Sequence, residues 1–150
     1  MSIRHSVTMG MLLLGPVSGF GQDVFPEKFA GCVTDHFALE SDTATAKHDG
    51  PAFVQLLKEQ LGERTMSNLR GELKLQIIVT LDGTSCLLSI ENSTNTKTRK
   101  LKLKQIVDTH AKWDPPPQKV AALIVLDFTE HGIGYRRLGM NGKTGWHYLR

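Results

Sequence analysis

One stretch of the sequence constrains the fold more than any other, because it alternates apolar and polar residues and then reaches a turn signal. Leucine, isoleucine or valine occupies every second position of residues 73–81, which places these side chains on one face of a β-strand. Asp82-Gly83 follows directly and supplies the positive φ of a tight turn. Residues 84–91 alternate in the same way. We therefore predict an antiparallel hairpin, in which Cys86, Leu88 and Ile90 face the same core as the first strand.

Two helices and a third strand are predicted on either side of this hairpin. Residues 53–61 repeat apolar side chains at helical spacing, and so do residues 103–113, which run into Pro115. Residues 120–128 are almost all apolar and rich in β-formers. The predicted fold is α+β, with two helices packed on one face of a small antiparallel β-sheet.

A second hairpin is predicted at the C-terminal end. Asn141-Gly142 is a two-residue turn signal between residues 135–138 and residues 146–149. We assign residues 132–150 to a C-terminal β-hairpin extension, which is well placed to pair with or cover strand 120–128.

The N-terminal residues are typical of a secretory signal peptide. Arg4 precedes an apolar stretch and then small residues up to Gly21. The apolar stretch is shorter than the roughly 20 residues that a bilayer-spanning helix needs. We predict a cleaved signal peptide, residues 1–21, no permanent membrane anchor, and a periplasmic or secreted protein. Residues 22–49 are mixed in character and are expected to form an irregular lead-in.

Export changes how the two cysteines, Cys32 and Cys86, are interpreted. Oxidising compartments permit disulfides, and a bridge between these positions would stabilise the fold by about 4 kcal/mol on the loop-entropy model. Two buried thiols that act as small apolar side chains are the alternative. The sequence leaves both interpretations open.

Charge and motif content exclude several functional classes. The net charge of +3 comes from scattered residues and does not indicate nucleic-acid binding. The histidines are dispersed, and the sequence has no Cys/His spacing of a zinc site. We therefore expect no catalytic residues, no cofactor, no metal and no enzymatic activity.

The order of these elements resembles the C-terminal domain of the TonB family over residues 50–131. The resemblance rests on the helix 53–61, the strand that starts at Gly71 and ends in Asp82-Gly83, Trp113 with Pro115, and the strand that ends at Phe128. It implies a periplasmic module that binds protein and serves outer-membrane transport. The family's anchor helix and Pro-rich spacer are not seen here, so transmission of force is not expected.

By this resemblance, the partner is a protein or peptide that pairs with an exposed edge strand, and a homodimer is left open. The expected contacts are Val120, Ala122, Ile124, Leu126 and Phe128, together with Tyr135, Arg136 and Arg137. The alternative is a structural or inhibitory secreted protein whose C-terminal hairpin closes the sheet and leaves no receptor contact. Any binding would then use Tyr135, Arg136, Arg137, Trp146 and Tyr148. A free strand 120–128 favours the first function, and a covered one favours the second.

Overall fold

The computed structural model describes residues 23–149. The predicted signal peptide, residues 1–21, lies outside the described residues. The strands are β1 (Glu27–Lys28), β2 (Ala38–Leu39), β3 (Gly71–Val79), β4 (Ser85–Asn92), β5 (Val120–Thr129), β6 (Gly132–Asn141) and β7 (Gly145–Tyr148). The helices are α1 (Gly50–Leu61), α2 (Glu63–Asn68), α3 (Thr98–Leu101) and α4 (Leu103–His110).

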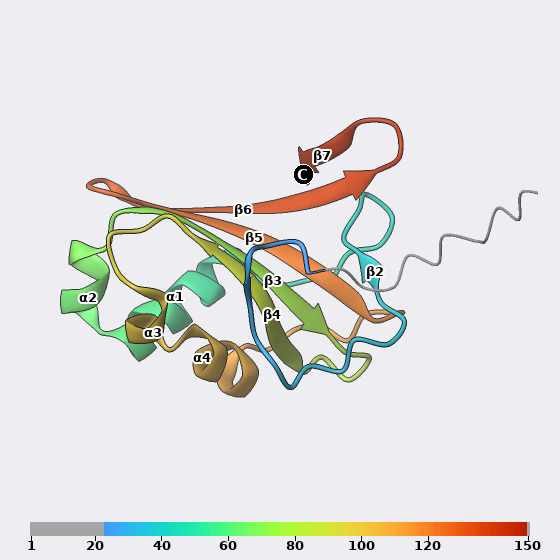
Figure 1. Ribbon diagram of the computed structural model, residues 1–150, viewed down its shortest axis with the longest axis horizontal. Helices are drawn as coiled ribbons and strands as arrows, with labels where there is room; N and C mark the ends of the chain where they lie inside the picture. Colours follow the sequence, from blue (N-terminus) through green and yellow to red (C-terminus); the bar gives the residue numbers. More distant parts are fainter. Residues whose placement is uncertain (1–22, 150) are drawn as a thin grey trace, which may run out of the picture.

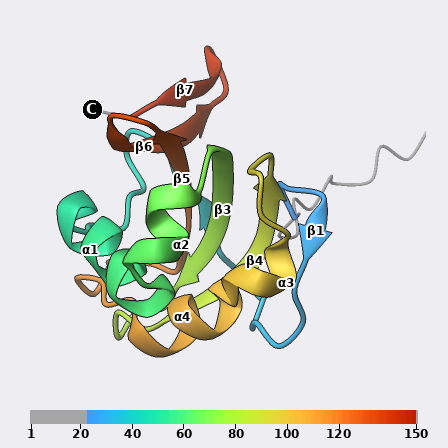
Figure 2. The same cartoon turned by 90° about the vertical axis from the view of Figure 1, so that its left-hand side faces the viewer.

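The predicted α+β class is confirmed. The strands form one sheet of order β1-β4-β3-β5-β6-β7, in which all neighbours are antiparallel, and β2 adds to β5 as a parallel strand. The helices lie together against one face of this sheet (Figures 1 and 2). The helical segments break at Gly62 and at Lys102, both of which have positive φ. The second predicted helix ends at His110, and Trp113 is buried beyond that end.

The main core lies between the helices and the sheet. Alternate residues of β3, including Leu73, Leu75 and Ile77, are almost inaccessible and pack against α1 and α4 residues such as Phe53 and Val107. The period-2 pattern that predicted this strand therefore also identified its buried face.

A β-bulge in β4 contradicts the predicted orientation of Cys86 and Leu88. Gln76 on β3 pairs with Ser89, but the next residue, Ile77, pairs with Leu87, so Leu88 is an extra residue in the ladder. An extra residue inverts the alternation of side chains. Consequently Leu87 joins Ile90 in the helix-side core, and Cys86 lies opposite Ile78 on the other face.

The N-terminal segment packs over that other face. The side chain of Phe25 is buried, and its backbone N–H donates to Ser89 Oγ at 3.2 Å. The backbone N–H of Val24 donates to Gln76 Oε1 at 2.8 Å, and Ser89 Oγ donates to the same oxygen at 2.5 Å. Gln76 and Ser89 are fully buried, so these bonds satisfy polar groups that would otherwise destabilise the sheet.

Candidate functional site

The structure corrects the expected role of strand 120–128. One edge of β5 pairs with β3 along residues 120–128, and the other edge pairs with β2 at Val120 and Ala121 and with β6 from Leu123 to Thr129. The expected contact residues on this strand are buried in the helix-side core; these are Val120, Ala122, Ile124, Leu126 and Phe128. The expectation that they form a free edge is therefore wrong. A run that is apolar on both faces is typical of an interior strand.

The C-terminal hairpin is present, as predicted. Its turn has three residues, 142–144, between Asn141 and Gly145, rather than two. The Asn141 carboxamide oxygen accepts hydrogen bonds from the backbone N–H groups of Lys143 at 3.0 Å and Thr144 at 2.6 Å. Gly145 follows with a φ of +68°, the conformation that closes such a three-residue loop.

This hairpin creates a new exposed edge, because β7 is much shorter than β6. Strand β7 pairs with Leu138–Asn141 of β6, and the backbone N–H of Leu149 donates to the Arg137 carbonyl at 2.9 Å. Within residues 23–149, no strand pairs with the outer edge of Gly132–Arg136 (Figure 1). Gly132 and Gly134 are exposed there. We call residues 132–136 the β6 edge.

A groove of about 410 Å³ lies at the start of the β6 edge, between β6 and the α1–α2 region. Its apolar lining is Met66, Leu69, Phe128 and Ile133, and its rim carries charged and polar groups that include Lys58, Glu63, Arg70 and His131. An apolar floor with a polar rim is the usual form of a site that binds a side chain of a partner.

The three predicted hairpin contacts point to different sides of β6. Tyr135 packs on the helix side, with its ring centroid 6.2 Å from that of Phe53, and burial raises its pKa while the neighbouring Arg137 opposes that rise. Arg136 lies on the other side. Its guanidinium stacks over the ring of Tyr148 at 4.4 Å and pairs with Asp127.

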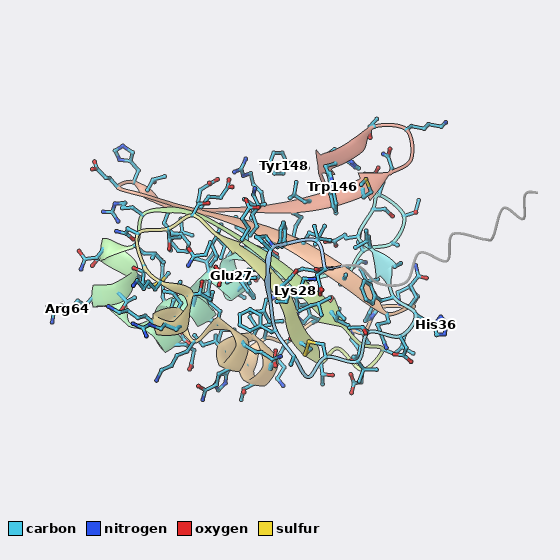
Figure 3. The ribbon with its side chains drawn as sticks, viewed as in Figure 1. Glu27, Lys28, His36, Arg64, Trp146 and Tyr148 are labelled. Carbon is cyan, nitrogen blue, oxygen red and sulfur yellow. A yellow bond between two sulfur atoms is a disulfide. The ribbon has the colours of Figure 1, made fainter. Side chains whose placement is uncertain are left out.

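Two aromatic side chains are exposed on the hairpin, and one of them, Tyr148, lies beside the β6 edge. Trp146 and Tyr148 keep 45% and 50% of their surface accessible, and both project from β7 (Figure 3). Tryptophan and tyrosine are enriched at the energetic centres of protein interfaces. The structure therefore brings Arg136 and Tyr148 together beside the exposed edge.

A buried ion pair, which the sequence reasoning missed, supports the hairpin from within. The Glu40 carboxylate is inaccessible and pairs with the Arg137 guanidinium, and it also accepts from the backbone N–H groups of Ala46 at 3.3 Å and Leu123 at 3.2 Å. Burial raises the pKa of Glu40, and Arg137 opposes that rise. Arg137 also lies 5.3 Å from the ring centroid of Trp113. Arg137 thus supports the C-terminal hairpin from inside the fold and has little exposed surface.

The two cysteines form a disulfide, with a Cα–Cα distance of 5.6 Å, which confirms the first of the two interpretations. Asp35, which follows Cys32 closely in sequence, pairs with Lys119 at 2.6 Å. Residues 23–149 contain no cluster of three or more His, Cys, Asp or Glu side chains that could hold a metal ion. In the same range, no helix has the length and apolar character of a membrane span. A disulfide is compatible with an extracellular or periplasmic location.

Comparisons of the chain with protein-family models, with curated proteins and with solved structures found no match. The resemblance to the TonB family therefore stays a prediction from the sequence.

Proposed function

We propose that this protein is an exported binding module that holds an extended peptide segment of another protein along the β6 edge. The observation that carries the proposal is an exposed main-chain edge beside a groove with an apolar floor. In recognition by strand addition, main-chain hydrogen bonds provide affinity and pockets for alternate side chains provide specificity.

The fold offers a defined path for such a peptide. A guest strand antiparallel to β6 would continue in line with β7, starting next to Tyr148 and Leu149 and ending at Gly132. Its side chains would alternate between the two faces of the sheet. On the helix side they would meet the groove around Ile133, and on the other side they would meet Arg136 and Tyr148.

A structural or inhibitory role is the second candidate, and one observation favours it: β6 covers strand 120–128 as that function requires. For the same reason we do not propose a TonB-type contact through strand 120–128. A role in outer-membrane transport rests on the family resemblance alone and stays a prediction.

Amide hydrogen exchange on the protein without residues 1–21 tests the proposal. We expect fast exchange at alternate amides of residues 132–136 and slow exchange throughout β5. Binding of a hit from a library of extended peptides should slow exchange at residues 132–136. Tyr148→Ala should weaken that peptide's binding by about tenfold, whereas Leu81→Ala, which removes an exposed side chain on the β3–β4 turn, should not.

Two results would decide against the proposal. Slow exchange at every amide of residues 132–136 in a dilute monomer would mean that the edge is closed. Protection that grows with protein concentration and needs no peptide would identify a second copy of this chain as the occupant of the edge.

A further inference from the structure

A lysine ammonium group lies directly against the disulfide. Lys104 Nζ is 3.3 Å from Cys86 Sγ and 3.8 Å from Cys32 Sγ. The lysine is held there by Asp108 at 2.6 Å and by the Leu87 carbonyl at 3.4 Å. Asp108 is fixed in turn, because its Oδ1 accepts from the backbone N–H of Leu87 at 2.7 Å. The ammonium is therefore positioned by α4 and by the bulged strand β4.

The charges around the two sulfur atoms are unequal. The ammonium is closer to Cys86 than to Cys32. Asp108 Oδ2 also lies near Cys86 Sγ, at 3.8 Å, and opposes the effect of the lysine, but it is farther away than the ammonium. A positive group beside a sulfur atom favours its thiolate form, so Cys86 is the better leaving group when the S–S bond breaks.

Cys32 is the more approachable side of the bond. Both cysteines are half-buried, but the residues that flank Cys32 are exposed. Val33 keeps 66% of its surface accessible, and apart from the two chain neighbours of Gly31, no residue has an atom within 4 Å of the position where a Cβ would project from it. An attacking thiolate can therefore approach from the loop that carries Cys32, on the side away from Cys86.

We propose that Cys32–Cys86 is a thiol–disulfide exchange site with a fixed polarity. An external thiolate attacks Cys32 Sγ, a new S–S bond forms between that thiol and Cys32, and the Cys32–Cys86 bond breaks. Its electron pair leaves on Cys86, which becomes a thiolate paired with the Lys104 ammonium. One disulfide is consumed and one is formed, so the step needs no other oxidant or reductant. This inference does not depend on the proposed peptide site.

The co-reactant is a thiol, either a small one or the first cysteine of a dithiol oxidoreductase. The exchange would release the loop around Cys32 from β4. Strand β1 would stay paired with β4, because the pairing of Glu27 with Ile90 does not involve the disulfide. The site would thus couple the redox state of the compartment to the order of this loop.

The direct test is to expose the oxidised protein briefly to reduced glutathione, quench with acid, alkylate the free thiols and locate the adduct by mass spectrometry. At low conversion we expect glutathione on Cys32 and the alkylated thiol on Cys86. An adduct mainly on Cys86, or equally on both cysteines, would overturn the proposal. This measurement on the unaltered protein needs no variant.

Variants of Lys104 test the cause of the polarity. Lys104→Met should slow the exchange by about three- to tenfold and reduce the preference for Cys32, whereas Lys104→Arg should retain both. Lys100→Met, which removes an exposed lysine of α3, is the matched control. Equal unfolding midpoints of the oxidised variants would exclude a loosened α4 as the cause. An unchanged rate in Lys104→Met would refute the role of the ammonium.

Discussion

Replacing Arg137 by methionine leaves the Glu40 carboxylate buried without its counter-ion. In the folded protein, none of the Glu40 side chain and only 14% of the Arg137 side chain is accessible. Two backbone N–H groups, from Ala46 and Leu123, remain as donors to the carboxylate, but they carry no charge. Removing one partner of a buried pair costs about 3–5 kcal/mol, so we expect Arg137→Met to lose about that much of a total stability of about 5–15 kcal/mol.

The loss should depend on pH in a defined direction. Burial already raises the pKa of Glu40 above its ordinary value of 4.5, and Arg137 limits that rise. Without Arg137 the folded-state pKa rises further. When folding raises the pKa of a carboxyl group, the group lowers the stability of the folded state least below the unfolded-state pKa. Stability then falls as pH rises towards the folded-state pKa. The cost of Arg137→Met should therefore be smallest below pH 4.5 and should grow until the folded pKa is passed.

Urea denaturation across this pH range provides the assay, with Arg136→Met as the matched control. Arg136 is the next residue on β6, but its pair with Asp127 is 39% and 34% exposed, and pairs of this kind contribute about 0–1 kcal/mol. A double variant with Glu40→Gln should lose less than the sum of the two single variants. An Arg137→Met variant that costs no more than Arg136→Met, or whose cost is the same at every pH, would refute the reasoning.

Two further predictions concern local contacts. Hydrogen bonding to Asp42 raises the pKa of His147 above 6.5, with a smaller contribution from the Gly145 carbonyl; the resulting stabilisation is complete below pH 6.5 and is lost as pH rises through the folded pKa. Asp42→Asn should remove this pH dependence from the thermal midpoint, and an unchanged pH profile would contradict it. Gly83 has a φ of +79°, and a Cβ there would lie 2.3 Å from the Trp113 carbonyl oxygen. Gly145 has a similar φ of +68° but open space around it, so Gly145→Ala should lower the free energy of unfolding by about 1–2 kcal/mol. Gly83→Ala should lower it clearly more. Equal losses in urea denaturation would contradict the steric argument.

The parts of the fold that were predictable are those encoded by local periodicity. The alternation of residues 73–81 identified β3 and its buried face, and Asp82-Gly83 identified the turn. On β4 the same alternation predicted the wrong face of the sheet for Cys86 and Leu88. Leu88 is an extra residue in the ladder, so the side chains between it and the β3–β4 turn point to the face opposite the predicted one. A bulge of this kind leaves no signal in the apolar pattern, since both Leu87 and Leu88 are apolar.

The position of β5 in the sheet was less visible. Its sequence is apolar on both faces, which favours an interior strand, yet an interior position also requires something to cover the second face. The lead-in segment lies on the second face of the sheet, where Phe25 is buried beside Ser89 of β4, and the sequence of this segment shows no periodicity. The lead-in is therefore part of the folded domain, although it contains few regular elements.

The ion pair behind the hairpin could not be predicted. Glu40 and Arg137 are separated by 97 residues, and charged residues are usually exposed. The β6 edge was missed for a related reason: the turn signal at Asn141-Gly142 located the hairpin, but the sequence did not show that β7 pairs with only the last four residues of β6.

The contacts between the lead-in and the C-terminal hairpin also determine when the chain can finish folding. The Glu40 carbonyl accepts from the backbone N–H of Met140 at 2.8 Å, in addition to the ion pair with Arg137 and the bond between Asp42 and His147. A chain made or exported from its N-terminus exposes Glu40 long before Arg137 arrives. The carboxylate has to stay hydrated during that interval, because burial without its partner is costly. The native sheet therefore closes only after the whole chain has emerged, and until β6 arrives most of one edge of β5 stays unpaired.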